Sequence, residues 1–151
     1  MIVYKGELVI DVIKNMIKVD LEIICDSNKE KFYINKNMNT VEITSKNNIT
    51  YEVSKDIIPL IRFISETKEI SIDSKEKNLT FNIKYAGKII NNNTINQVKK
   101  DWTELGIYLP WFPVNEKMEK SKFKINVVCI GGEDSKILYP LSPKKIIDSK
   151  L

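Results

Sequence analysis

Paired carboxylates are the residues of this chain whose type and spacing come closest to catalytic chemistry. Asp20 and Glu22 stand two positions apart, and Glu133 and Asp134 are adjacent. Two carboxyl groups of different pKa can act as the acid and the base of glycoside hydrolysis. Acidic residues on the wet face of a strand or in a turn are, however, ordinarily solvated charges. The pattern favours this second interpretation, and we expect no catalytic residue in the chain.

The absence of histidine removes most other kinds of active site. None of the 151 residues is His, so the commonest general base and metal ligand is missing. The chain also lacks the G-x-S-x-G elbow and the glycine-rich phosphate-binding patterns. Cys25 and Cys129 lie far apart without C-x-x-C spacing, which favours two free thiols over a disulfide or a metal site. We therefore expect a non-enzymatic chain with no metal and no cofactor of its own.

The composition predicts a globular domain and argues against two kinds of partner. A hydrophobic fraction of 42% with 29% charged residues is ordinary for one soluble domain. The net charge is +4, but only one basic residue, Arg62, is an arginine, whereas nucleic-acid recognition favours guanidinium groups gathered on one face. Glu7 and Asp11 interrupt any secretory signal, and no apolar stretch is long enough to span a membrane. We expect neither nucleic acid nor membrane as a partner, and a cytoplasmic location if the chain has not been trimmed.

The elements that would position these residues are β-strands. Between residues 17 and 25 apolar and polar side chains alternate, as they do in a strand with one wet face. The same alternation predicts further strands over residues 31–35, 41–44, 49–53, 69–73, 79–85, 123–128 and 136–139. About eight short strands joined by polar turns predict an all-β fold, an antiparallel β-sandwich.

The connections between the expected strands are read from their turn residues. Residues 26–30 predict a turn from which the next strand returns, and residues 46–48 predict a hairpin. Residues 57–64 fit either a buried strand or a short helix. We expect a surface loop over residues 91–100. The whole chain, 1–151, is treated as a single domain, with the segments 1–14 and 140–151 peripheral to it.

The most distinctive stretch of the sequence is residues 101–113, DWTELGIYLPWFP. Both tryptophans of the chain, Trp102 and Trp111, occur here with Tyr108 and Phe112. Large rings of this kind fill a core, or they give a protein or peptide partner a rigid contact area. The two alternatives are compatible. We predict that these four residues are contacts of such a partner.

Three segments follow one another in an order that resembles a known family. They are KFYIN with VEI at residues 31–43, LTFNIKYAGKI at residues 79–89, and WFP at residues 111–113 followed by a strand at residues 123–127. Between about residues 15 and 140 the chain resembles the N-terminal β-domain of aminopeptidase N type zinc metallopeptidases, the gluzincins. The resemblance implies a saddle-like β-domain that packs against a peptidase domain and lines one wall of its substrate cleft.

The resemblance also implies a role for Glu104. In the family, an acidic or amide residue eight positions before the F-P phenylalanine, here Phe112, helps to hold the free α-amino group of the substrate. A carboxylate there can bind an ammonium group by a charge-assisted hydrogen bond. Trp102 stands where the family commonly has an amide. The family's H-E-x-x-H zinc motif is absent from these 151 residues, so zinc is implied only if a catalytic domain follows.

Two functions are therefore expected. The leading one is a non-catalytic scaffold and substrate-side wall for a peptidase domain, with an apolar docking face that self-association would otherwise cover. The alternative is a stand-alone intracellular module that binds a protein or peptide, for example by adding a strand to an open sheet edge.

Overall fold

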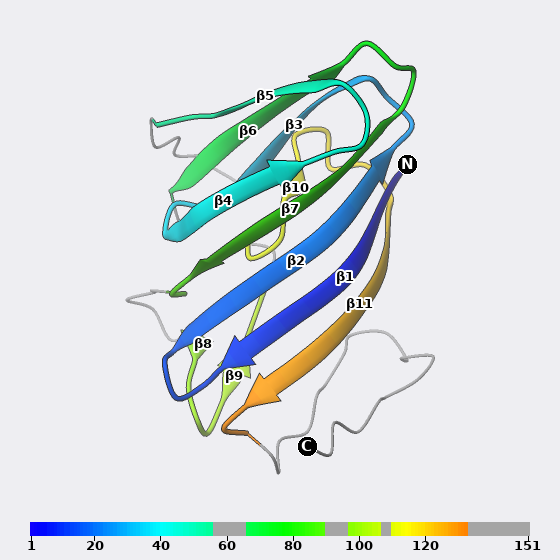
Figure 1. Ribbon diagram of the computed structural model, residues 1–151. Coiled ribbons are helices and arrows are strands. Elements are labelled where there is room, and N and C mark those ends of the chain that lie inside the picture. Colours follow the sequence, from blue (N-terminus) through cyan, green and yellow to red (C-terminus); the bar gives the residue numbers. More distant parts are fainter. Residues whose placement is uncertain (56–65, 90–96, 107–109, 133–151) are drawn as a thin grey trace.

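The structure is a computed structural model that describes residues 1–55, 66–89, 97–106 and 110–132. These residues form an all-β fold with two main sheets and a small hairpin (Figure 1), as the alternation predicts. The strands are β1 (Ile2–Asp11), β2 (Met16–Cys25), β3 (Lys29–Asn35), β4 (Met38–Thr44), β5 (Ile49–Val53), β6 (Thr67–Ser74), β7 (Leu79–Gly87), β8 (Gln97–Val98), β9 (Thr103–Glu104), β10 (Val114–Asn115) and β11 (Ser121–Ile130). Nowhere in this part of the chain is there a helix with the length and apolar character to cross a membrane.

The larger sheet has the strand order β11-β1-β2-β7-β4. Neighbouring strands in this sheet are antiparallel, except that β1 and β11 run parallel. The expected sandwich is thus not wholly antiparallel. A parallel pair needs a connection that leaves the sheet and returns, and the chain reaches β11 from β10 in the other sheet.

The smaller sheet, in the order β10-β3-β6-β5, packs against the inner face of the larger one. Phe32 of β3 and Phe81 of β7 meet across the interface with their ring centroids 5.8 Å apart and an interplanar angle of 64°. Both rings are almost completely buried. Such an edge-to-face pair adds about 0.5–1.5 kcal/mol to the burial of the two rings. The core therefore lies between the two sheets.

The hairpin expected at residues 46–48 is wrong, and the turn expected at residues 26–30 joins strands of different sheets. After β2 the chain crosses to the smaller sheet, where β3 pairs with β6, and after β4 it crosses again, where β5 also pairs with β6. β4 itself pairs with β7. Polar residues at 26–30 and 46–48 mark a change of direction, but the partner of each strand is decided by which sheet buries its apolar face.

The expectation that residues 1–14 are peripheral is also wrong. β1 lies between β11 and β2, and its inward side chains, such as Tyr4 and Leu8, are buried. The alternation of this strand is interrupted at Gly6, which follows Ile2 and Tyr4 at every second position but has no side chain and is exposed. Gly6 has φ 146°, and a Cβ there would stand 2.0 Å from the carbonyl oxygen of Asp20. The close approach of β1 and β2 thus requires glycine.

Several other expectations can be compared with the structure. Cys25 and Cys129 are free thiols, as predicted. The loop expected over residues 91–100 includes the short strand β8, which pairs with β9. Residues 57–64, 136–139 and 140–151 lie outside the described residues.

Candidate functional site

The aromatic segment forms a strap, which we define as residues 110–115. The strap is tied to two strands of the larger sheet by buried tyrosines. The hydroxyl of Tyr85, from β7, donates to the carbonyl oxygen of Trp111 at 2.6 Å. The hydroxyl of Tyr4, from β1, donates to the carbonyl oxygen of Pro113 at 2.7 Å. At its end, the strap continues as β10, which pairs with β3 of the smaller sheet. Both sheets therefore hold the strap.

Phe112 is the centre of a cluster of aromatic rings. Its ring lies 5.1 Å from that of Trp111, 5.5 Å from that of Tyr4 and 5.1 Å from that of Phe123, edge to face in each case. The rings of Tyr4 and Phe123 are stacked at 4.9 Å. Trp111 and Phe112 are half-buried and pack against the core. For these two residues the structure supports the core alternative, and a contact with a partner stays a prediction.

The other predicted contact residues are placed differently. Trp102 lies at the tip of the β8–β9 hairpin, where its carbonyl oxygen accepts a hydrogen bond from the backbone N–H of Lys99 at 3.2 Å. Its side chain is 55% exposed. Glu104 lies in β9, paired with Gln97, and is also exposed. Tyr108 lies outside the described residues. The structure thus separates the predicted residues into a packed pair on the strap and an exposed pair on the hairpin.

The β8–β9 hairpin lies at the same end of the molecule as the β1–β2 turn and the end of β11 (Figure 1). The backbone N–H of Val12 donates to the carbonyl oxygen of Ile130 at 3.1 Å. With its amide oriented to satisfy its neighbours, Asn15 donates to the carbonyl oxygen of Val98 at 3.0 Å. Three large apolar side chains are exposed at this end, and we call them the end surface: Ile13, Trp102 and Ile130.

The β1–β2 turn, which carries Ile13 of the end surface, is stabilised by local hydrogen bonds. The Asp11 carboxylate accepts hydrogen bonds from the backbone N–H groups of Ile13 and Lys14, at 3.1 and 2.9 Å, and so shapes the β1–β2 turn. Ile13 at this turn is 73% exposed, and Ile130 is 40% exposed. Single exposed apolar residues need no explanation, whereas a contiguous exposed apolar patch marks a contact with another molecule.

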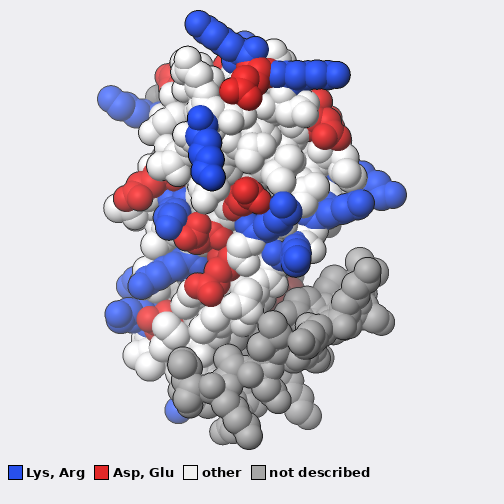
Figure 2. All heavy atoms as spheres, turned by 45° about the vertical axis from the view of Figure 1, so that its right-hand side comes forward, with Lys and Arg blue, Asp and Glu red and all other residues white. Residues whose placement is uncertain are grey.

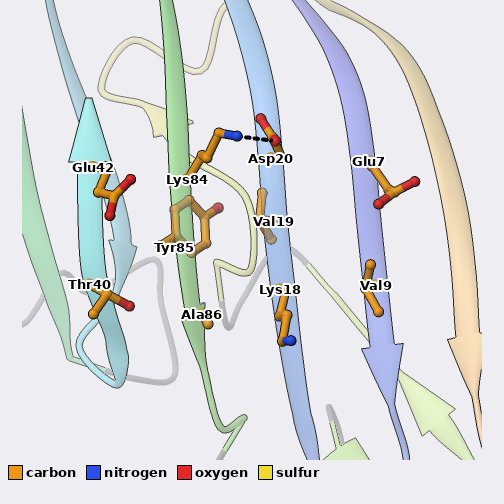
Figure 3. A pocket seen from close by; sticks show the side chains of 10 residues that line it. All are labelled: Glu7, Val9, Lys18, Val19, Asp20, Thr40, Glu42, Lys84, Tyr85 and Ala86. Carbon is orange, nitrogen blue, oxygen red and sulfur yellow. Dashed lines mark ion pairs between the residues drawn. The ribbon is translucent and has the colours of Figure 1, made fainter. Parts of the chain in front are cut away.

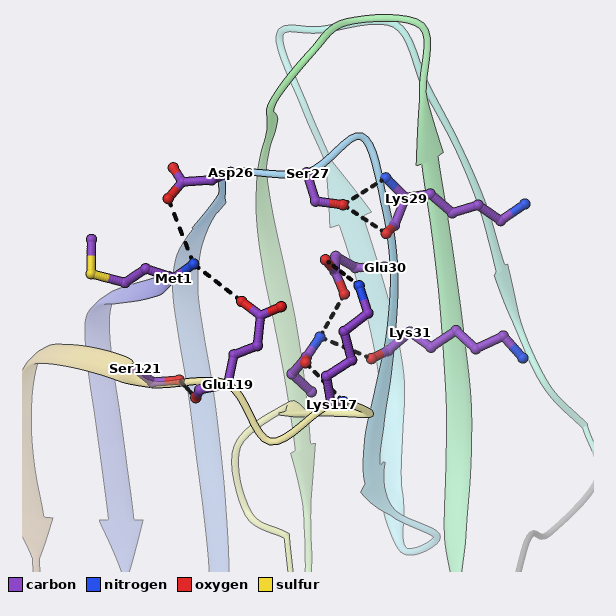
Figure 4. Close-up of polar contacts among 10 residues, drawn as sticks. Met1, Asp26, Ser27, Lys29, Glu30, Lys31, Lys117, Glu119 and Ser121 are labelled. Carbon is purple, nitrogen blue, oxygen red and sulfur yellow. Dashed lines mark hydrogen bonds and ion pairs between the residues drawn. The ribbon is translucent and has the colours of Figure 1, made fainter.

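Glu30, expected in a turn, is a buried carboxylate near the start of β3. It is 4% exposed and accepts a hydrogen bond from the side-chain amide of Asn115 at 2.7 Å; Figure 4 shows Glu30 beside Lys117. The Lys117 ammonium lies 3.4 Å from its second oxygen. A buried carboxylate whose oxygens are hydrogen-bonded in this way fixes the position of the segments that it contacts. Glu30 thus joins β3 to the strap and to the turn that leads into β11. No local signal distinguishes it from the solvated acids of its turn.

The paired carboxylates Asp20 and Glu22 lie on the outer face of the larger sheet. Asp20 forms an ion pair with Lys84 at 2.8 Å, and Glu22 forms one with Lys5 at 3.2 Å. A hollow of about 360 Å³ on this face is lined by carboxylates and ammonium groups of the sheet (Figure 3). Figure 2 shows basic and acidic side chains interspersed over the face in view. The solvated interpretation of this pair is consistent with these contacts. Glu133 and Asp134 lie outside the described residues.

Burial raises the pKa of several acidic hydroxyl and thiol groups. It raises the pKa of Cys25 from 9.0 to about 12, and it raises the pKa of Tyr33 to about 12 with the help of a hydrogen bond to Glu69. Burial also holds the pKa values of Tyr4 and Tyr85 above 10.0. All four groups are therefore neutral near pH 7.

These shifts predict that the fold loses stability in alkali. Because each folded pKa lies above the unfolded one, the unfolded chain loses its protons first, and stability falls as pH rises. We expect the free energy of unfolding to be level between about pH 6 and 8 and to fall as pH rises through the unfolded pKa values of cysteine and tyrosine towards 12. Urea unfolding at successive pH values measures it, and Cys25→Ala should flatten the first part of the decline. A profile that stays level from pH 8 to 11 would contradict the assignment.

The described residues thus define a two-sheet β-domain with a strapped aromatic cluster and an exposed end surface. Within them, no three His, Cys, Asp or Glu side chains come together as metal ligands. Comparisons of the chain with models of protein families, with curated proteins and with solved structures found no match. The resemblance to the aminopeptidase β-domain accordingly stays a prediction.

Proposed function

We propose that the chain is a non-catalytic β-domain, similar to the N-terminal domain of zinc aminopeptidases, that serves as scaffold and substrate-side wall for a peptidase domain. The observation that carries this proposal is the position of Glu104. It is exposed at the end of the molecule that bears the end surface. A substrate-side wall requires an apolar face that docks the peptidase domain, and beside it a carboxylate that can bind the amino group of a substrate.

The contacts of the exposed hairpin support this role. Among the described residues Glu104 forms no ion pair, so its carboxylate can accept an ammonium group. Trp102, two residues earlier, offers a large rigid ring of the kind that dominates protein interfaces. Ile13 and Ile130 extend the apolar area on neighbouring tips. In this proposal the docked domain supplies the zinc ion with its ligands, because the present chain contains no histidine.

The length of the native product gives the first test. The mass of the 151 residues is 17.5 kDa, and the proposal expects a larger product, or a companion chain, that carries a histidine zinc motif. Intact-mass and peptide mapping of the protein from its source would measure this. A product of 17.5 kDa without a companion peptidase would contradict the proposal and leave a free-standing protein- or peptide-binding module.

In the larger protein, Glu104→Ala is expected to raise KM for peptides with a free amino terminus by about tenfold or more. One hydrogen bond to a charged group contributes about 1.5–3 kcal/mol. Glu104→Gln keeps the shape and the acceptor oxygen and should lose less. N-acetylated peptides provide the matched control, because they have no ammonium group to lose. An equal effect on both classes of peptide would assign Glu104 a structural role instead.

A further inference from the structure

The edge strands of the two main sheets differ in how well they resist the addition of another strand. Within the described residues the edges are β11 and β4 in one sheet and β10 and β5 in the other. β11 carries Lys122 and Lys124, and β4 has a register shift between Asn39 and Glu42. β10 has only two residues and follows Pro113. Lysine, bulges, proline and short length are the devices that protect sheet edges.

β5 has fewer of these devices than the other three edges. It contains no lysine, glycine or proline, and its five residues pair with β6 in unbroken register. Its single charge is Glu52. The three central residues of the strand are exposed. Figure 1 shows β5 at the margin of the smaller sheet, beyond β6.

The hydrogen bonds around β6 show which backbone groups of β5 point away from the sheet. The N–H of Ser54 donates to the carbonyl oxygen of Glu69 on β6 at 2.8 Å, whereas the N–H of Ser74 donates away from β5, to Asn28. Because hydrogen-bonded pairs alternate along an antiparallel ladder, Thr50 and Glu52 direct their N–H and C=O groups towards β6. The backbone N–H and C=O groups of the other three residues of β5 therefore point away from β6, to the edge of the sheet. These residues are Ile49, Tyr51 and Val53.

The side chains of β5 present a different chemistry on each face. Tyr51 is paired with Ile72, a core residue, and so points to the inner face, yet it is 49% exposed. Glu52 is paired with Ser71 and points to the outer face. A strand added here would place every second side chain beside Tyr51 and the intervening ones beside Glu52. The first set should be apolar, and the second should be basic.

We propose that β5 binds an extended peptide in which apolar and basic residues alternate, by adding it as a further strand of the smaller sheet. Main-chain hydrogen bonds to Tyr51 supply affinity, and the Tyr51 and Glu52 side chains supply specificity. The proposal does not depend on whether a peptidase domain follows the chain. It is tested on the 151 residues alone.

The binding test uses a fluorescent heptapeptide, T-K-V-K-V-K-T, measured by anisotropy. The controls are T-E-V-E-V-E-T, which reverses the charges, and K-K-T-V-V-T-K, which has the same composition without alternation. The wild-type chain should bind the first peptide more tightly than either control. Glu52→Lys should invert the preference between the two alternating peptides, because like charges on neighbouring strands repel.

The backbone contribution is tested with a matched pair of variants. Tyr51→Pro removes an N–H that points to the open edge and leaves the ladder to β6 intact, while Tyr51→Thr removes the ring and keeps the N–H. Affinity for T-K-V-K-V-K-T should fall at least about tenfold further in Tyr51→Pro than in Tyr51→Thr, because a main-chain bond is lost and the ring of proline obstructs the edge. Circular dichroism checks that both variants fold.

Amide hydrogen exchange of the wild-type chain gives a measurement that needs no variant. The Tyr51 N–H should exchange fast in the free chain and become protected when the peptide is added. Protection without peptide would overturn the proposal, because it would show that the edge is already covered. Absence of binding by T-K-V-K-V-K-T, equal binding of K-K-T-V-V-T-K, or equal affinities of the two Tyr51 variants would overturn it as well.

Discussion

Gly6→Ala is expected to lower the free energy of unfolding by roughly 4 kcal/mol or more, which is a large share of the stability of a small domain. A Cβ at this position would lie 2.0 Å from the carbonyl oxygen of Asp20, and both partners of this contact belong to backbone. The φ of 146° is in addition strained for any residue with a side chain. The clash cannot be relieved by turning a side chain. β1 must therefore move away from β2, at the centre of the larger sheet.

Urea unfolding, followed by circular dichroism, measures the loss. Glu7→Ala is the matched control, because Glu7 is the next residue of β1 and is exposed, and its loss should change stability by no more than about 0.5 kcal/mol. If Gly6→Ala unfolds at the same urea concentration as Glu7→Ala, then β1 and β2 do not approach one another as closely as described.

Phe112→Ala is expected to cost about 2–4 kcal/mol, whereas Trp102→Ala should change stability by about 0.5 kcal/mol or less. Phe112 contacts the rings of Tyr4, Trp111 and Phe123, so its removal leaves a cavity beneath the strap. Trp102 is 55% exposed and loses little on truncation. The two substitutions therefore compare the stability lost at a packed ring with that lost at an exposed ring of the same aromatic segment.

Thermal and urea unfolding of the two variants, measured side by side, test this difference. Phe112→Leu keeps most of the volume and should recover about half of the loss. Equal stability of Phe112→Ala and Trp102→Ala would mean that the strap does not pack on the core. A destabilised Trp102→Ala would in turn argue against the end surface as a docking face, because the Trp102 ring would then be needed by the fold.

Alternation along the chain was sufficient to predict most of the long strands. β2 and β7 were expected close to their observed bounds, because every second residue is apolar and must be buried on one face. β1 was not expected, since its alternation of apolar and polar side chains is interrupted by Gly6 and Glu7, both exposed, at its centre. The need for glycine at this position follows from the short distance between Gly6 and the Asp20 carbonyl oxygen, which only the three-dimensional structure shows.

The candidate site was less predictable than the strands. The sequence identified the aromatic segment, but not that Phe112 is packed while Trp102 is exposed. That difference depends on hydrogen bonds from Tyr4 and Tyr85 to the strap, between residues that are 109 and 26 positions apart. Glu30 was indistinguishable from its solvated neighbours for the same reason, since the amide that bonds it belongs to Asn115.

The sequence by itself determined the all-β class of the part that the structure describes and the lack of any histidine in the 151 residues, because side-chain alternation and residue types are local properties. Only the tertiary structure decided which sheet each strand joins, that β11 lies parallel to β1, and that β5 is an edge strand among the described residues. A turn such as residues 46–48 reverses the chain equally well within a sheet or between sheets. The choice is made by the burial of apolar faces against residues distant in sequence, which no short stretch of the chain encodes.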